Sequence, residues 1–129
     1  MSTTGKGVAR EGGAVIGAVL LLAAMTNGAS AADAEHGKVV FQTCTACHSD
    51  KPGAIGPSLR GVYGRKSGAL DGFRYSNAMM RANLVWDDAN LRAYLTDPQA
   101  KVKGNRMPFS GLKDVKDVDD VIAYLEQLR

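Results

Sequence analysis

Cysteine is scarce in this sequence: two of the 129 residues, Cys44 and Cys47, are cysteines. A disulfide between residues so close together would remove little entropy from the unfolded chain, so no disulfide framework is expected to stabilise the domain. A large excess of one charge is also lacking. The net charge is +3 for the whole chain, and +2 without Lys6, Arg10 and Glu11 of the first 31 residues, which argues against nucleic-acid binding because such domains carry dense basic stripes. Repeats and convincing strand patterns are absent as well, which leaves an all-α domain as the predicted fold class.

A membrane-spanning run is missing too. The apolar stretch at residues 14–25 is shorter than the roughly 20 residues that a transmembrane helix needs. Lys6 and Arg10 precede it and small residues follow it, which is the pattern of a secretory signal peptide. We therefore expect residues 1–31 to be a cleaved signal peptide and residues 32–129 to be a mature domain in the periplasm of a bacterium. An uncleaved membrane anchor is the alternative.

Helical patterns are present, and four helices are predicted, at residues 33–44, 75–83, 86–98 and 117–128. Asp33, Ser76 and Asp87 lie at the start of the first three and are predicted to cap them, because such side chains accept hydrogen bonds from free backbone N–H groups. Pro98 is predicted to end the third helix. The last helix has the clearest pattern, since its apolar residues recur at helical spacing.

Glycine and proline concentrate between the first two helices. Residues 49–72 hold six glycines together with Pro52 and Pro57, which predicts a long loop. Long loops are uncommon in compact domains unless they line a binding site. We therefore expect this loop to wrap around a bound group, which would also stabilise so small a domain.

The stretch CTACH, residues 44–48, joins both cysteines to one of the two histidines. A redox dithiol of the thioredoxin kind would need a βαβ context, which the sequence does not show. A zinc site needs about four ligands, and a second cysteine pair is missing. Covalent haem attachment uses this spacing, because each thiol adds to one vinyl group and His48 is placed to bind the iron. We favour haem attachment, with the dithiol and the zinc site as alternatives.

One imidazole leaves a second axial position on the iron to be filled. Met79 and Met80 lie in a predicted helix, where methionine usually fills gaps in the core. Met107 instead lies in a glycine-bounded loop with Pro108 behind it, and such a loop can bring a thioether to the far face of a flat ring. We favour Met107 as the second metal ligand, while His36 or an open position remain alternatives.

Seven features together resemble the class I c-type cytochromes, most closely the mitochondrial and purple-bacterial cytochrome c group. They are CTACH, GPSLRGVYGRKSG, GFRYS, Trp86, AYL, MPFSG and DVIAYL, in the order and spacing of that family. The resemblance covers nearly the whole of residues 32–129. It implies an all-α cytochrome c fold of helices and long loops wrapped around one haem c, which is bound covalently through Cys44 and Cys47.

The same resemblance implies roles for further residues. Pro57 would accept the Nδ1 proton of His48, and Tyr94 would place its hydroxyl near the thioether of Met107. The haem propionates would be held by Arg65, Tyr75, Ser76 and Trp86. The first and last helices would cross at Gly37, Phe41 and Tyr124.

This chain departs from the family pattern at two positions. Met79 stands where relatives commonly carry a buried asparagine, and Thr43 stands where many carry a lysine that binds partners. A basic surface patch remains possible from Lys51, Arg74, Lys101, Lys103 and Arg106.

The function that the resemblance implies is that of a soluble periplasmic electron carrier, not an enzyme. With His48 and Met107 on the iron, no position is open for a substrate. The expected partners are transient redox proteins of a respiratory or photosynthetic chain: a quinol–cytochrome oxidoreductase as donor, and a terminal oxidase, reaction centre or dehydrogenase as the other partner. The protein is expected to be a monomer that binds no nucleic acid. An enzymatic or gas-sensing haem protein and a haem-free cysteine module are the alternatives.

Overall fold

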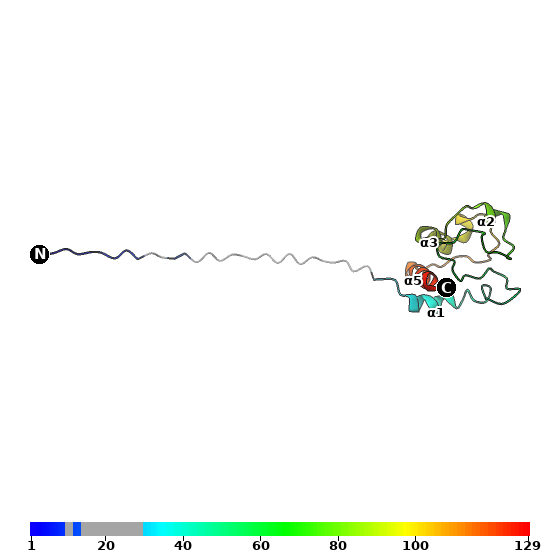
Figure 1. Cartoon of the computed structure of the whole chain (residues 1–129), viewed down its shortest axis with the longest axis horizontal. Coiled ribbons are helices and arrows are strands. Elements are labelled where there is room, and N and C mark those ends of the chain that lie inside the picture. Colours follow the sequence, from blue (N-terminus) through cyan, green and yellow to red (C-terminus); the bar gives the residue numbers. More distant parts are fainter. Residues whose placement is uncertain (10–11, 14–29) are drawn as a thin grey trace.

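The computed structural model describes residues 1–9, 12–13 and 30–129. This part of the chain forms five α-helices and no strand, which confirms the predicted all-α fold (Figure 1). The helices are α1 (Ala34–Phe41), α2 (Asn77–Arg81), α3 (Asp88–Thr96), α4 (Pro98–Lys101) and α5 (Val115–Gln127). Among these described residues, no helix has the length and apolar character needed to span a bilayer.

The signal-peptide prediction depends on the apolar run at residues 14–25, which lies outside the described residues. Cleavage of residues 1–31 therefore stays a prediction. The first described helix, α1, begins at Ala34, after its cap at Asp33.

The predicted N-caps are confirmed. The side chain of Asp33 accepts hydrogen bonds from two backbone N–H groups of α1, and those of Ser76 and Asp87 each accept one at the start of α2 and α3. The first helix is shorter than predicted, because after Phe41 the backbone changes to bonds between residues three apart. Pro98 lies beyond the end of α3, as expected, but it also occupies the first turn of α4, a helix that the sequence patterns did not predict.

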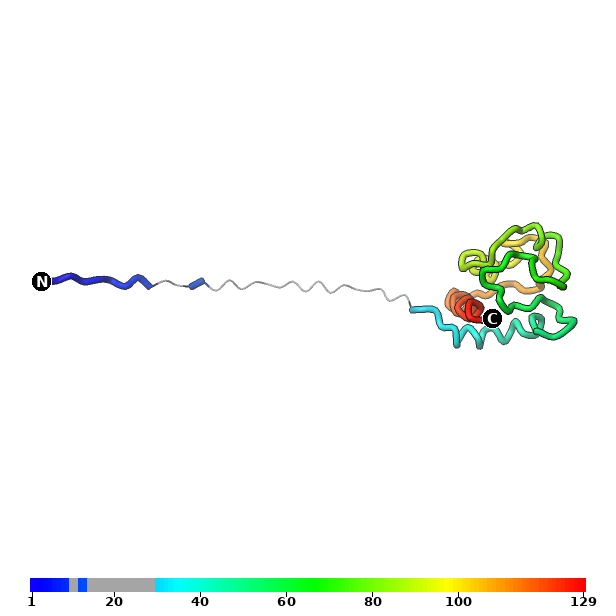
Figure 2. The backbone as a smooth tube through the Cα atoms, viewed as in Figure 1, coloured from blue at the N-terminus to red at the C-terminus, as the bar shows by residue number. Residues whose placement is uncertain are grey.

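Helices α1 and α5 cross in close contact (Figure 2). A Cβ atom at Gly37 would lie 1.9 Å from the carbonyl oxygen of Asp120, so only glycine lets the two backbones approach this far. Beside this contact the rings of Phe41 and Tyr124 pack with their centroids 5.0 Å apart. The crossing expected at these residues is confirmed.

A buried carboxylate fastens the same crossing. Asp120 is 0% exposed and accepts hydrogen bonds from the backbone N–H of Asp33 and from Nδ1 of His36, each at 2.7 Å. The ammonium group of Lys116 donates to it as well. The bond from Asp33, followed by that from Lys116, lowers the pKa of Asp120 to about 2. The first residue of the folded domain is thus bound to its last helix.

We predict that this carboxylate makes the fold sensitive to acid. Its pKa in the folded state lies below the ordinary value of about 4, so the unfolded chain takes up the proton first. Its contribution to stability is therefore complete above about pH 4 and is lost as the pH falls towards about 2. Guanidinium unfolding at several pH values should show this loss in the wild type but not in Asp120→Asn, which should already be less stable at pH 7.

Asp119→Asn is the matched control, because Asp119 is the neighbouring aspartate and its side chain is 37% exposed. It should keep the acid dependence of the wild type. If Asp120→Asn kept that dependence too, the acid sensitivity would belong to other groups.

Candidate cofactor site

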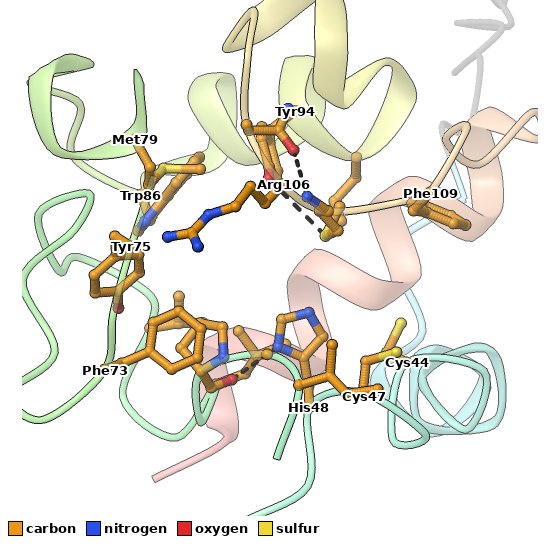
Figure 3. A pocket seen from close by; sticks show the side chains of 18 of the residues that line it. Cys44, Cys47, His48, Phe73, Tyr75, Met79, Trp86, Tyr94, Arg106 and Phe109 are labelled. Carbon is orange, nitrogen blue, oxygen red and sulfur yellow. Dashed lines mark hydrogen bonds between the residues drawn. The ribbon is translucent and has the colours of Figure 1, made fainter. Parts of the chain in front are cut away.

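A cavity of about 660 Å³ lies between the CTACH turn, helix α3 and the loop that carries Met107 (Figure 3). All ten predicted site residues line it: Cys44, Cys47, His48, Pro57, Arg65, Tyr75, Ser76, Trp86, Tyr94 and Met107. Its volume is within the range of pockets that enclose small molecules. Because protein interiors are otherwise close-packed, so large an internal space in a small domain fits a bound group that completes the core.

Both cysteines and the histidine of the CTACH motif lie on one wall of the cavity (Figure 3). The backbone N–H groups of Cys47 and His48 donate to the carbonyl of Cys44, at 3.1 and 2.9 Å, and so fold the segment after α1 into a tight turn. Burial raises the pKa of the Cys44 thiol, whereas a redox dithiol needs a lowered thiol pKa. Cys44 therefore lacks the lowered pKa of an attacking thiol in a redox dithiol.

The imidazole of His48 is oriented by one hydrogen bond. Its Nδ1 lies 2.8 Å from the carbonyl oxygen of Pro57, and since that oxygen only accepts, Nδ1 donates. Nε2 is then left with a free lone pair on the cavity side (Figure 3). Gly56 packs against the ring, because a Cβ built there would lie 2.7 Å from Cε1 of His48. The sequence patterns did not single out Gly56; its place directly before Pro57 was the available signal.

Tyr94 and the loop of Met107 lie across the cavity from His48 (Figure 3). The Tyr94 hydroxyl donates to the Met107 sulfur at 3.9 Å. Burial raises the pKa of Tyr94 to about 12, so this hydroxyl keeps its proton at neutral pH. Sequence patterns also missed Asn105, which is 8% exposed and whose side-chain oxygen accepts the backbone N–H of Met107 at 2.9 Å. Its amide nitrogen donates to two backbone carbonyls and so fixes the loop.

Two of the residues predicted to hold propionates already have partners in the protein. The guanidinium group of Arg65 donates to the backbone carbonyls of Ser58 and Arg60, each at 3.0 Å. The hydroxyl of Ser76 accepts the backbone N–H of Met79 at 3.0 Å as the cap of α2. Both residues also line the cavity, so each one supports the cavity wall and borders the space inside it.

Tyr75, Trp86 and Met79 gather at one end of the cavity (Figure 3). Met79 is 8% exposed and lines the cavity. The position at which this chain differs from the family pattern therefore lies within the site. Arg106 was expected only in the basic surface patch. Its side chain nevertheless reaches into the cavity, where Nη2 donates to the backbone carbonyl of Arg74 at 2.8 Å. Arg106 therefore brings a positive charge to the cavity mouth.

The alternative ligand sets find no support in the described residues. His36 is bound to Asp120 at the crossing of α1 and α5, and it does not line the cavity. In the ranges 1–9, 12–13 and 30–129, no three His, Cys, Asp or Glu side chains gather as a metal site. The cavity wall holds one imidazole, that of His48, and two thioethers, those of Met79 and Met107. Met107 is the one bonded to Tyr94, which lies across the cavity from His48 (Figure 3).

Residues 34–129 match the family described as cytochrome c. Cytochrome c2 from Blastochloris viridis is 44% identical over 112 residues, which cover 84% of this chain and 88% of that protein. Cytochrome c2 iso-2 from Magnetospirillum fulvum is 50% identical over 90 residues, 68% of this chain and 94% of that protein. The structure of cytochrome cH from Methylobacterium extorquens aligns with a TM-score of 0.71 at 45% identity, over 74% of this chain and 98% of that one.

We predict that the ring of His48 depends on the missing side chain at Gly56. In Gly56→Ala the added methyl group would lie 2.7 Å from the imidazole and displace it. Overpacking of this kind costs about 1–3 kcal/mol, so the free energy of unfolding in guanidinium should fall by that order. Ile55→Ala is the control, because Ile55 is the next residue and is 74% exposed. Equal stability of both variants would show that the ring moves freely.

Proposed function

This chain belongs to the cytochrome c family, and we propose that it is a soluble periplasmic carrier that moves single electrons between membrane redox complexes. Membership in this family means that the chain is an electron carrier with one covalently attached haem c, and that it is not an enzyme. Our proposal adds the iron ligands, the location and the partners. The observation that supports it most is the facing pair of His48 and Met107 in one cavity whose wall also holds both cysteines.

In this proposal Cys44 and Cys47 form the two thioether bonds, and His48 and Met107 bind the iron. The haem supplies reversible one-electron chemistry when bound. Pro57 holds the proton of His48 on Nδ1, which leaves Nε2 as the ligand atom and strengthens it as a donor. A thioether as second ligand raises the reduction potential. With both positions taken by side chains, the protein has no place on the metal for a substrate.

The polar groups around the cavity would keep the ligands and the charges in place. Tyr94 directs its proton at the Met107 sulfur and restricts the orientation of the thioether. Arg65, Tyr75, Ser76 and Trp86 are proposed to hold the propionates. Arg74 and Arg106 add two further guanidinium groups at the same cavity. Such partners are needed because a carboxylate taken from water without a partner is strongly destabilised.

The partners are proposed to be larger redox complexes with acidic docking surfaces. Arg74 and Arg106 are exposed residues at the cavity mouth, and Ile55, which also lines the cavity, is 74% exposed. A positive rim around an apolar contact suits brief association with a small buried area. Charge would act mainly on the association rate and would weaken with salt. A quinol–cytochrome oxidoreductase is the proposed electron donor. A terminal oxidase, reaction centre or dehydrogenase is the proposed second partner. The protein is proposed to act as a monomer.

The periplasmic location is supported by the pattern at residues 1–31. The first described helix, α1, is capped by Asp33, so cleavage after residue 31 would remove no part of the five described helices. Mass spectrometry of protein purified from the periplasm would test this cleavage directly.

We predict that Met107→Ala opens the iron. In the oxidised holoprotein the near-infrared methionine–iron band should disappear, and the reduced form should bind carbon monoxide at neutral pH. Axial ligands shift haem potentials over a range of about 0.8 V, so the midpoint potential should fall by an amount on the order of 0.1 V.

Met80→Ala is the matched control, since Met80 is a methionine whose side chain is 61% exposed and does not line the cavity. It should leave spectrum and potential unchanged. An unaltered spectrum and potential in Met107→Ala would rule out the proposed ligation.

A further inference from the structure

The loop after His48 is closed by a side-chain bond next to the one that orients the imidazole. Ser58 Oγ donates to Oδ1 of Asp50 at 2.6 Å, and the neighbouring residue Pro57 accepts the proton of His48 at 2.8 Å. Asp50 follows His48 by two residues, and Ser58 follows Pro57 by one. The two bonds therefore connect the same two segments of the loop, residues 48–50 and residues 57–58, at neighbouring positions.

The second oxygen of Asp50 is occupied as well. Arg60 Nε donates to Oδ2 at 2.6 Å, while its Nη1 donates to the backbone carbonyl of Arg129 at 2.8 Å. The backbone N–H of Arg60 also donates to Ser58 Oγ at 3.3 Å. One carboxylate thus connects the residue after the proline, the loop beyond it and the C-terminal end of the chain.

Pro57 needs such support from its neighbours. It has no backbone N–H, so it cannot fix its own position by donating to the surrounding backbone. Gly56 on one side donates to the carbonyl of Cys47 at 2.8 Å. On the other side Ser58 is held at two atoms: its hydroxyl donates to Asp50, and its backbone carbonyl accepts from Arg65 at 3.0 Å.

We propose that Asp50 is a positioning residue for the iron ligand: by bridging Ser58 and Arg60, its carboxylate holds the Pro57 carbonyl against Nδ1 of His48. The inference rests on the proposed ligation of the iron by His48. It adds a residue that does not line the cavity and that the family resemblance did not assign.

Stability alone does not account for this arrangement. The side chains of Asp50 and Arg60 are 48% and 57% exposed, and ion pairs this exposed contribute little to folding. The predicted effect of Asp50 is therefore local. It should be visible in the properties of the imidazole and only weakly in the free energy of unfolding.

The chain offers a matched control in the ion pair of Arg92 and Asp119. Their side chains are 45% and 37% exposed, they join α3 to α5, and neither residue lines the cavity. Replacing Asp119 removes a surface ion pair of comparable exposure and leaves the loop after His48 unchanged.

The test uses the holoproteins of the wild type, Asp50→Ala, Ser58→Ala and Asp119→Ala, with ¹⁵N-labelled histidine. Three quantities are measured: the hydrogen-exchange rate of His48 Nδ1–H by NMR, the midpoint potential and the denaturant midpoint. We expect exchange about fivefold faster in Asp50→Ala, the factor that corresponds to about 1 kcal/mol. The potential should rise, because a weaker bond to Pro57 makes the imidazole a poorer donor to the oxidised iron.

Ser58→Ala should show the same two changes, and it keeps the test open if Asp50→Ala fails to assemble. Asp119→Ala should match the wild type in exchange and potential. The inference is overturned if both loop variants match the wild type, or if Asp119→Ala changes exchange and potential as much as they do. If the His48 ring signals of the wild type did not differ between the oxidised and reduced protein, the ligation itself would be wrong, and the inference would fall with it.

Discussion

The contact of α1 with α5 at Gly37 determines where the functional part of the molecule lies. The two backbones touch there, and the buried Asp120 ties the start of α1 to the same place. The CTACH turn follows directly after α1, so its position is set by this crossing. Leu125 of α5 also lines the cavity. A small shift of one helix would therefore move the cysteines, His48 and the cavity wall together.

The cavity makes this domain unusual as a folding problem. A small domain has little apolar area to bury, and here a space of about 660 Å³ lies where its core would be. The covalent haem of the family fills that need, since it provides apolar surface in the place that side chains leave free. The polar groups at the cavity hold the two proposed iron ligands in place. Pro57 is bound to His48, and Asn105 and Tyr94 are bound to Met107, so each of the two residues is held by hydrogen bonds of its own.

Many features of the fold and of the cavity could be predicted from short stretches of sequence. The three N-caps depend on residues within one turn of each other, and CTACH depends on five consecutive residues. The motif and the loop pattern predicted Cys44, Cys47, His48 and Met107, and the family resemblance added six more residues because it includes the spacing of a whole fold. All ten line one cavity. Helix α4 was missed, since four residues show no periodicity. Asn105 was missed as well, because an asparagine in a loop looks like any solvated residue until its burial is known.

By itself the sequence determined the helix starts and the chemistry of the attachment motif, because both depend on groups that are neighbours along the chain. Only the tertiary structure decided which distant groups share a bond. It paired Asp33 with Asp120, 87 residues away, and so engaged His36 at the helix crossing, away from the cavity. It also turned Arg106 from a surface charge into part of the cavity mouth. Such pairings depend on the path of the folded chain, and local patterns do not contain that path.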